Sequence, residues 1–181
     1  MSRLTTNSSK RLGTTFFNRS TLTVAQELLG KFLVRRIRRK TISVMITETE
    51  AYCGPSDLAS HASRGRTKRT EVMFGPPGHA YIYLIYGMYH CFNIVTEKED
   101  YPAAVLIRAI DAEGVNGPGK LCRYFQINRS LNNEDLTASK KLWLEDRKVK
   151  VKPSQIKCFP RIGIDYAGSY KNKLWRFVLS P

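Results

Sequence analysis

The spacing of hydrophobic and polar residues predicts a chain of short strands with few helices. Residues 21–29 carry hydrophobic side chains at helical spacing and stop at Gly30, which predicts a helix closed by a glycine cap. Residues 32–37 and 42–52 are rich in β-branched residues and predict two strands joined by a turn. Strand periodicity places one set of side chains of the second strand on a single face: Ile42, Val44, Ile46, Glu48, Glu50 and Tyr52. Because this face begins apolar and ends in two carboxylates and a phenol, it indicates a sheet edge that opens into a cleft.

The rest of the chain continues the mixed pattern. Residues 53–79 are irregular and rich in Gly, Pro, Ser and Arg, which is typical of a binding surface. Residues 81–86 and 89–95 predict a β-hairpin, residues 103–110 and 174–179 predict strands, and helices are expected from Gly119 and over residues 136–144. Since strands and helices mix without a βαβ alternation, we expect an α+β domain built on an antiparallel sheet.

The charge of the chain indicates a polyanionic partner. Thirty Lys and Arg residues against 15 Asp and Glu residues give a net charge of +15. Residues 31–40 hold six of the basic residues, and smaller clusters lie at residues 64–69, 147–152 and 171–176. The alternative is a solvated basic face that only keeps the protein in solution.

Other classes of protein find little support. No apolar run approaches the roughly 20 residues of a membrane span, and the first 13 residues are polar, so we expect a disordered basic tail over residues 1–13, a folded domain over residues 14–181, and a protein that works inside a cell. No metal is expected, because the cysteines and histidines lack metal-ligand spacing: Cys53, Cys91, Cys122, Cys158, His61, His79 and His90.

Three features could carry chemistry, and each has an ordinary alternative. The aromatic hairpin of residues 81–93 is, by itself, better explained as core packing, although rings near a basic surface also stack on bases or wedge between them. Glu50 could stabilise an oxocarbenium-like centre and deprotonate water, but spacing alone favours ion pairs of Glu48 and Glu50 with arginines. Residues 117–122 resemble a helix start, which either holds a phosphate or serves only as a turn.

Taken together, the motifs resemble those of the alkyladenine (3-methyladenine) DNA glycosylase family of the non-helix-hairpin-helix type. They run in order from about Phe16 to Val178 as Thr49–Tyr52, Gly54-Pro55, His61, Tyr83–Asn93, Leu106–Arg108, Gly117–Cys122, Ile127-Asn128 and Arg161–Gly163. The resemblance implies a single compact domain with a curved antiparallel β-sheet flanked by helices and a β-hairpin protruding at about residues 81–95.

The resemblance also implies a function. It implies a monomeric, monofunctional enzyme of base excision repair that acts on damaged double-stranded DNA from the minor groove, in the compartment of the genomic DNA. Such an enzyme flips alkylated or deaminated purines (3-methyladenine, 7-methylguanine, hypoxanthine, ethenoadenine) and hydrolyses the N-glycosidic bond. It leaves an abasic site, has no lyase step and needs no cofactor.

Residue roles follow from the same resemblance. Glu50 would deprotonate the water, helped by Arg108 and the backbone carbonyl of Ile162. Tyr86 would fill the gap left by the flipped nucleotide. The base pocket would be formed by Tyr52, His61, Tyr83 and Asn93, with Asn93 crowding the 2-amino group of guanine. Candidates for contacts with the DNA backbone are Arg64, Arg66, Lys68, Arg69, Met88 and Lys120.

Two other functions remain open from the residues alone. The basic surface and the aromatic hairpin would suffice for a catalytically silent nucleic-acid-binding module. The isoelectric point also fits an RNA-binding, ribosome-associated protein. Glu50 together with Arg108 separates these functions from an enzyme, because a binding module gains nothing from a carboxylate that faces a polyanion.

Overall fold

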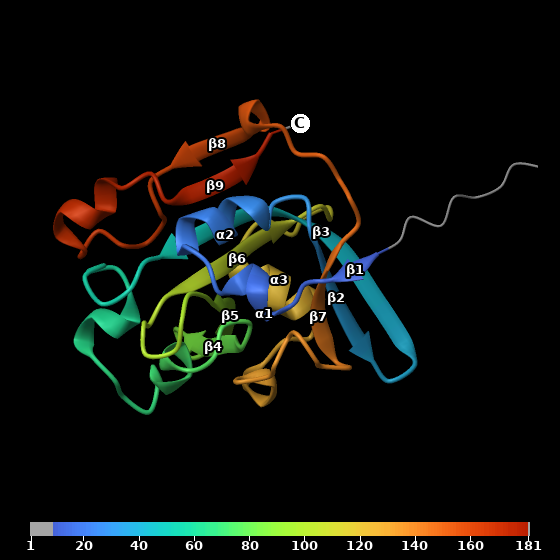
Figure 1. The fold of residues 1–181 in the computed structure, drawn as a ribbon, viewed down its shortest axis with the longest axis horizontal. Helices are drawn as coiled ribbons and strands as arrows, with labels where there is room; N and C mark the ends of the chain where they lie inside the picture. Colours follow the sequence, from blue (N-terminus) through green and yellow to red (C-terminus); the bar gives the residue numbers. More distant parts are fainter. Residues whose placement is uncertain (1–8, 181) are drawn as a thin grey trace, which may run out of the picture.

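One long antiparallel sheet organises the molecule (Figure 1). The computed structural model describes residues 9–180. The hydrogen-bonded order of the strands is β1-β7-β2-β3-β6-β5-β4, and β9 pairs with both β3 and β8. The strands are β1 (Lys10–Arg11), β2 (Phe32–Ile37), β3 (Lys40–Tyr52), β4 (Ala80–Ile85), β5 (Tyr89–Val95), β6 (Ala104–Ile110), β7 (Leu142–Asp146), β8 (Ile156–Phe159) and β9 (Arg176–Leu179). The helices are α1 (Thr14–Phe17), α2 (Thr21–Glu27) and α3 (Pro118–Tyr124).

The predicted α+β class, the curved sheet and the hairpin of β4 and β5 are confirmed. The structure also confirms the predicted helix over α2, the helix that begins near Gly119, and the strands β2, β3, β6 and β9. Residues 53–79 form turns and short 3-10 helices, as their composition predicts.

Strand β3 is the longest element, with 13 residues, and it holds the two halves of the sheet together. Residues 40–45 pair with β2, residues 46–52 pair with β6, and Glu48–Glu50 pair on their other edge with β9. The strand therefore begins at an outer turn and ends deep among its neighbours, with the two predicted carboxylates where three strands meet.

A bulge in β3 reverses which side chains face the core. Ile46 and its partner Ile110 are buried in the main hydrophobic core, and the pairing then shifts between Ile46 and Thr49. Beyond the shift, Thr49 pairs with Ile107, which is also in that core, and the Thr49 hydroxyl donates to the Ala25 carbonyl of α2 at 2.8 Å. An odd separation of core-facing residues is what a bulge produces.

The predicted single face from Ile42 to Tyr52 is therefore wrong. Ile46 faces the core, but Glu50 and Tyr52 project from the opposite side of the strand, since Thr49 and Ala51 occupy the core face there. The strict alternation assumed from sequence fails because a bulge inserts an irregular step.

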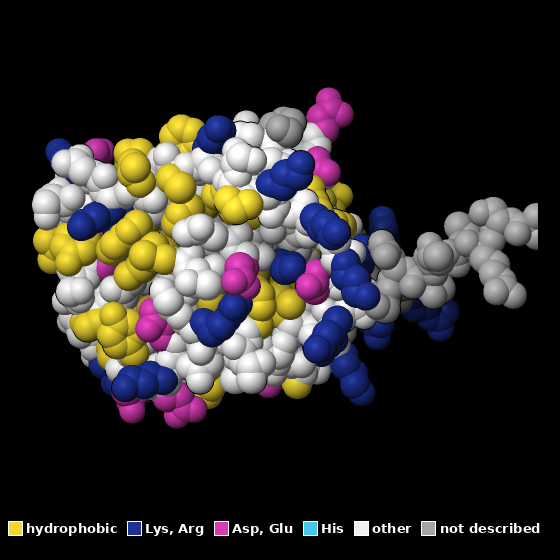
Figure 2. All heavy atoms as spheres, turned by 45° about the horizontal axis from the view of Figure 1, so that its top comes forward, with side chains coloured by type: hydrophobic (Ala, Val, Ile, Leu, Met, Phe, Trp, Pro, Cys, Tyr) yellow, Lys and Arg dark blue, Asp and Glu magenta, His cyan; other side chains and the backbone are white. Residues whose placement is uncertain are grey.

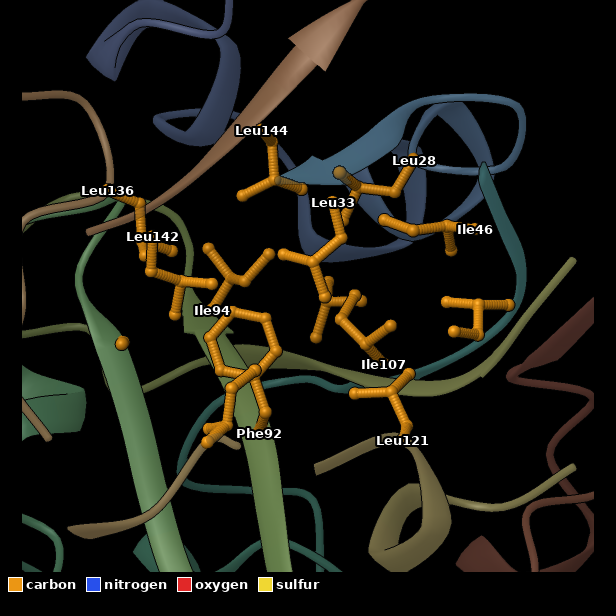
Figure 3. Packing of buried hydrophobic residues seen from close by; sticks show 14 of the residues in the cluster. Leu28, Leu33, Ile46, Phe92, Ile94, Ile107, Leu121, Leu136, Leu142 and Leu144 are labelled. Atoms are coloured by element: carbon orange, nitrogen blue, oxygen red, sulfur yellow. The ribbon is translucent and has the colours of Figure 1, made fainter. Parts of the chain in front are cut away.

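The main core lies between the sheet and the helices (Figure 3). Leu33, Phe92 and Ile107 come from different strands and are fully buried. Each such side chain contributes roughly 1.5–3 kcal/mol of burial free energy. Helices α2 and α3 have only seven residues each, too few to be stable alone, so this packing holds them. Other fully buried members are Phe17, Val24, Leu28, Leu121, Phe125, Leu136, Leu142 and Leu144.

Two further predictions differ from the structure. The helix predicted over residues 136–144 is wrong: Leu142 and Leu144 are buried at strand spacing in β7, which pairs with β1 and β2. Lys10 and Arg11 pair with β7, and Leu12 is buried, so the ordered part begins before residue 14. Residues 1–8 of the predicted tail lie outside the described residues.

Candidate active site

A cavity of about 300 Å³ opens between the β4–β5 hairpin, the end of β3 and two loops. This volume lies at the lower end of the range for small-molecule pockets. Except for Glu50, the cavity gathers every residue predicted to act in catalysis, base binding or intercalation: Tyr52, His61, Tyr83, Tyr86, Asn93, Arg108 and Ile162. The structure thus brings together residues that are up to 110 positions apart in the chain.

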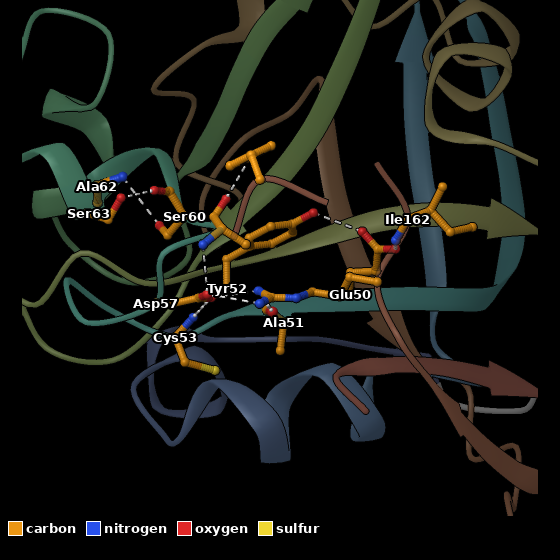
Figure 4. Close-up of polar contacts among 12 residues, drawn as sticks. Glu50, Ala51, Tyr52, Cys53, Asp57, Ser60, Ala62, Ser63 and Ile162 are labelled. Atoms are coloured by element: carbon orange, nitrogen blue, oxygen red, sulfur yellow. Dashed lines mark hydrogen bonds and ion pairs between the residues drawn. The ribbon is translucent and has the colours of Figure 1, made fainter. Parts of the chain in front are cut away.

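Glu50 lies directly beneath the cavity and has no exposed surface. Its Oε1 accepts a hydrogen bond from the Ile162 amide at 2.9 Å and lies 3.4 Å from Arg108 Nη1. Its Oε2 accepts from the Tyr52 hydroxyl at 2.9 Å (Figure 4). Burial raises the pKa of the Glu50 carboxyl, and Arg108, the Ile162 amide and the Tyr52 hydroxyl oppose that rise. Ile162 contacts Glu50 through its amide, and the role of its carbonyl toward the attacking water stays a prediction.

A chain of charges extends from Glu50 to the surface. Arg108 Nε donates to Glu48 Oε1 at 3.0 Å, and Arg176 Nη1 donates to the same oxygen at 3.1 Å. Both arginines are largely buried, with side chains 12% and 20% exposed. Glu48 therefore fixes the guanidinium that faces Glu50. The ion pairs of Glu48 and Glu50 with arginines, favoured by spacing alone, do exist, and they lie at the cavity rather than away from it.

Behind Tyr52 lies a fully buried ion pair that the sequence did not reveal. Arg161 Nη1 and Nη2 donate to the two carboxylate oxygens of Asp57 at 2.6 and 2.8 Å, and both side chains are 0% exposed. The Arg161 guanidinium also lies 4.7 Å from the Tyr52 ring centroid and 5.0 Å from that of Trp175. Asp57 accepts from the Cys53 and Ala59 amides. One ion pair thus ties the loop after β3 to the segment that carries Ile162.

His61 and Tyr83 form another wall of the cavity. Their ring centroids are 4.6 Å apart at an interplanar angle of 76°. Arg69 Nη2 lies 3.4 Å from His61 Nε2, and because arginine only donates, Nε2 accepts. The neutral ring then carries its proton on Nδ1, 3.0 Å from the Tyr81 hydroxyl. Burial lowers the pKa of His61 to about 4, as do Arg69 and Arg64, so the ring is neutral at pH 7.

Asn93 and Cys91 come from β5 and line the cavity from the sheet side. Asn93 is 3% exposed, and its Nδ2 donates to the Tyr81 carbonyl at 3.1 Å, which fixes the amide. Burial raises the pKa of the Cys91 thiol, so it is a poor nucleophile.

The tip of the β4–β5 hairpin carries Tyr86 at the rim of the cavity. Tyr86 has a backbone φ of 51° and Gly87 a φ of 68°, and the Met88 amide donates to the Ile85 carbonyl to close the turn. Tyr86 is 86% exposed and Met88 is 65% exposed. A large aromatic ring held out in water by a tight turn is available to a partner.

The basic residues predicted to contact DNA differ in their surroundings. Arg64 and Lys68 are exposed. Arg66 pairs with Glu71 and Asp100 and lies over the Phe74 ring, so its charge is already compensated. Arg69 lies over Tyr83, 5.0 Å from the ring centroid, and Lys120 donates to Asn116.

Two features are absent from residues 9–180. No cluster of three or more His, Cys, Asp and Glu residues in that range could hold a metal ion. Nor is any helix there long and apolar enough to cross a membrane.

An aromatic cavity over a buried carboxylate, with an exposed tyrosine at its rim and a basic surface around it, is typical of enzymes that act on a base taken out of a nucleic-acid helix. Comparison with known proteins agrees. The model of the methylpurine-DNA glycosylase family matches residues 15–115 and 111–181.

Relatives cover nearly the whole chain. A protein of Methanocella arvoryzae is 50% identical over 90% of this chain and 88% of its own length. A protein of Desulfitobacterium hafniense is 45% identical over 94% of this chain and 95% of its own length. A protein of Ehrlichia chaffeensis is 47% identical over 91% of this chain and 90% of its own length. All three carry the name "Putative 3-methyladenine DNA glycosylase". The chain belongs to the methylpurine-DNA glycosylase family.

Proposed function

We propose that this protein is a monofunctional DNA glycosylase that removes alkylated or deaminated purines from duplex DNA and leaves an abasic site. The candidate substrates are 3-methyladenine, 7-methylguanine, hypoxanthine and ethenoadenine. The observation that carries the proposal is the position of Glu50, fully buried beneath an aromatic cavity and held by Arg108 and Tyr52.

The cavity suits a purine that carries positive charge. Tyr52 and Tyr83 offer electron-rich ring faces, which attract cations. His61 is neutral at pH 7 because its pKa lies at about 4, so it does not repel such a base. Asn93, whose amide is fixed by the Tyr81 carbonyl, is proposed to crowd the 2-amino group of guanine.

Glu50 acts as the general base in the proposed reaction. Glu50 takes a proton from water, the water oxygen bonds to C1′, and the bond from C1′ to the base nitrogen breaks with its electron pair going to the base. A purine with a positive charge, such as 3-methyladenine or 7-methylguanine, leaves neutral, so no second acid is needed to protonate it, unlike the alkoxide of a sugar. Hypoxanthine and ethenoadenine are neutral in DNA and leave as anions, which take up a proton from solvent. Since Glu50 has no exposed surface, the Tyr52 hydroxyl or the Arg108 guanidinium must shift to admit the water. The Ile162 carbonyl is proposed as a further partner of that water.

A lyase step is not part of the proposal. Such a step needs an amine that forms a Schiff base with the sugar. No lysine is found among the residues that line the cavity in the described part of the chain.

DNA is proposed to approach through its minor groove, with Tyr86 taking the place of the flipped nucleotide. Exposed aromatic or apolar side chains in the minor groove commonly wedge between base steps. Arg64, Lys68, Arg69, Met88 and Lys120 are proposed to contact the backbone around it, and Arg66 to do so only if its carboxylate partners release it. The protein is proposed to act as a monomer, alongside the genomic DNA.

The test is excision from duplexes that contain one of the four lesions. Wild-type protein should produce abasic sites, and Glu50→Gln should reduce the single-turnover rate by a factor of about 10² to 10⁴, the usual contribution of a general base. Glu113→Gln, the same change at an exposed carboxylate, is the matched control and should keep the wild-type rate.

One observation favours a silent binding module instead: every oxygen of Glu50 already has a partner in this structure. If wild type and Glu50→Gln both bind lesion duplexes but neither releases a base, the binding module is the better description. Equal excision by the two proteins would remove Glu50 from the role of base.

A further inference from the structure

The turn between β2 and β3 carries a cluster of exposed basic side chains far from the cavity. It includes most of the largest basic cluster of the sequence, residues 31–40. The segment that leads into β7 lies beside it, because the Arg36 amide donates to the Lys141 carbonyl at 2.8 Å. We call this cluster the distal basic turn; its members are Arg36, Arg38, Arg39, Lys40, Lys140 and Lys141, all exposed.

The charges of the distal basic turn are not compensated. Among residues 9–180 none of its six members takes part in an ion pair. In contrast, Arg19, Arg108 and Arg161 each lie against a carboxylate. Lys and Arg side chains gather at the right-hand end of the molecule in Figure 2, the end where the β2–β3 turn lies in Figure 1. Such a concentration of free positive charge repels itself, and a polyanion relieves that repulsion.

The position of this turn separates it from the base pocket. Lys40 begins β3 and Glu50 lies ten residues further along the same strand. At about 3.3 Å per residue, the two are about 33 Å apart along the strand. That distance is close to the 34–36 Å of one turn of B-DNA, after which the same groove faces a bound protein again.

We propose that the distal basic turn is a second DNA-binding surface, which contacts phosphates of the duplex about one helical turn away from the flipped nucleotide. Its ligand is the phosphate backbone, because guanidinium groups pair with phosphate oxygens through two parallel hydrogen bonds. Contacts of this kind carry no sequence information, so the surface holds undamaged DNA as well as damaged DNA. The location of the contact rests on the proposed function, whereas binding of undamaged DNA does not.

The test compares two variants of equal net charge. The first removes four charges from the turn: Arg36→Gln, Arg38→Asn, Arg39→Gln and Lys40→Gln, with Asn at position 38 because the backbone φ there is 54°. The matched control removes four exposed lysines elsewhere that form no ion pair: Lys98→Gln, Lys152→Gln, Lys157→Gln and Lys171→Gln. Thermal unfolding of both variants first establishes that they fold as the wild type does.

Binding to an undamaged duplex of three helical turns is then measured across a range of salt concentrations. Each lost phosphate contact lowers the magnitude of the slope of log K against log salt by about 0.9, so the turn variant should lose about 3.6 and the control less than about 1. With a lesion-bearing duplex shorter than one turn, which the pocket anchors and which does not reach the distal basic turn, the two variants should bind alike. Equal slopes on the long duplex, or different slopes on the short one, would overturn the proposal.

Two further results distinguish this proposal from RNA binding and from the proposed glycosylase function. If the turn variant loses affinity for duplex RNA but not for duplex DNA, the ligand is RNA and the DNA assignment is wrong. If the slopes differ as expected while the wild-type protein excises no base, the second surface stands and the proposed glycosylase function fails.

Discussion

At the scale of single residues, the chemistry of Glu50 depends on a balance of opposed effects. Burial favours the protonated carboxyl, and Arg108, the Ile162 amide and the Tyr52 hydroxyl favour the ionised one. A general base must be ionised to accept a proton, so these three groups keep it usable in a buried position.

Replacing Arg108 should shift the pH dependence of excision. Without the Arg108 charge, the pKa of Glu50 rises further above its usual value, so a higher pH is needed to ionise it. We expect Arg108→Gln to move the acidic limb of the single-turnover rate to higher pH and to lower the plateau rate by about tenfold or more.

Arg176→Gln is the control for this prediction. Arg176 lies opposite Glu50 on β9, but its guanidinium pairs with Glu48, and among the described residues the ion pair of Glu50 is with Arg108. The acidic limb of the pH-rate profile of Arg176→Gln should stay near that of the wild type. Identical pH-rate profiles for the wild type and Arg108→Gln would contradict the assigned role of Arg108.

At the scale of elements, the β4–β5 hairpin and the segment around Arg161 hold the cavity from different sides. The hairpin is built from residues close in sequence, whereas the Arg161–Asp57 pair joins residues 104 positions apart. Their substitutions should therefore have different effects on stability.

Tyr86→Ser should weaken binding of lesion DNA by about tenfold or more, since stacking of an aromatic ring contributes roughly 1–3 kcal/mol. The free energy of unfolding should change by less than about 0.5 kcal/mol, because Tyr86 is 86% exposed. Tyr86→Phe keeps the ring and should bind like the wild type. Titrations with lesion and undamaged duplexes measure the effect, and unchanged lesion affinity of Tyr86→Ser would exclude the wedge role.

Arg161→Met should destabilise the fold by about 3–5 kcal/mol, because it leaves Asp57 charged and buried without its partner. Adding Asp57→Asn removes that charge while keeping an acceptor for a backbone amide, so the double variant should recover part of the loss. Urea unfolding of the three proteins measures this. A double variant less stable than Arg161→Met would show that the backbone contacts of Asp57 dominate.

Local pattern predicted most elements correctly, and its failures have physical causes. The hairpin was predictable because its strands are adjacent in sequence and joined by a glycine turn. Residues 142–144 of β7 are predicted as part of a helix because these three consecutive apolar residues show no period of their own, and only pairing with β1 and β2 decides the conformation. Strands β1 and β8 have two and four residues, and the sequence around them has too few apolar residues to show a period, whereas β9 ends the largely apolar run that begins at Leu174.

The site was predictable as far as the family motifs extend. The resemblance named the cavity residues and Glu50, and the structure brings them together. It could not name the contacts of Glu48 with Arg176 or of Asp57 with Arg161, because those partners lie 128 and 104 positions apart and no local pattern joins them. The one local signal for the contact of Glu48 with Arg176 is the two-residue spacing of Glu48 and Glu50, which places both carboxylates on one face of the strand.

At the scale of the whole molecule, a net charge of +15 on 181 residues governs solution behaviour. Self-repulsion of like charges destabilises a compact protein, and a bound polyanion removes it. The proposed DNA-binding surfaces exist only in the folded state, because the unfolded chain does not hold their basic residues together.

Undamaged duplex DNA should therefore raise the melting temperature at low salt. At a duplex concentration 100 times Kd, binding stabilises the folded state by about 2.7 kcal/mol. For a domain of this size that amounts to about 5–10 °C. The shift should disappear at high salt, where phosphate contacts are lost. Differential scanning fluorimetry measures it, and a shift that persists at high salt would show that the contacts are not electrostatic.

The bulge in β3 has a consequence for insertions and deletions. Before the bulge, the even-numbered side chains of β3 face the core, and after the bulge the odd-numbered side chains face it. The even-numbered side chains therefore pack in the core at one end of the strand and face the cavity at the other. Deleting Thr49 while the bulge is kept would move Glu50 into the place of Thr49. The carboxylate would then point at α2, and the cavity would receive the methyl group of Ala51 instead. A single codon in this strand thus decides whether the molecule has an acid in its cavity at all.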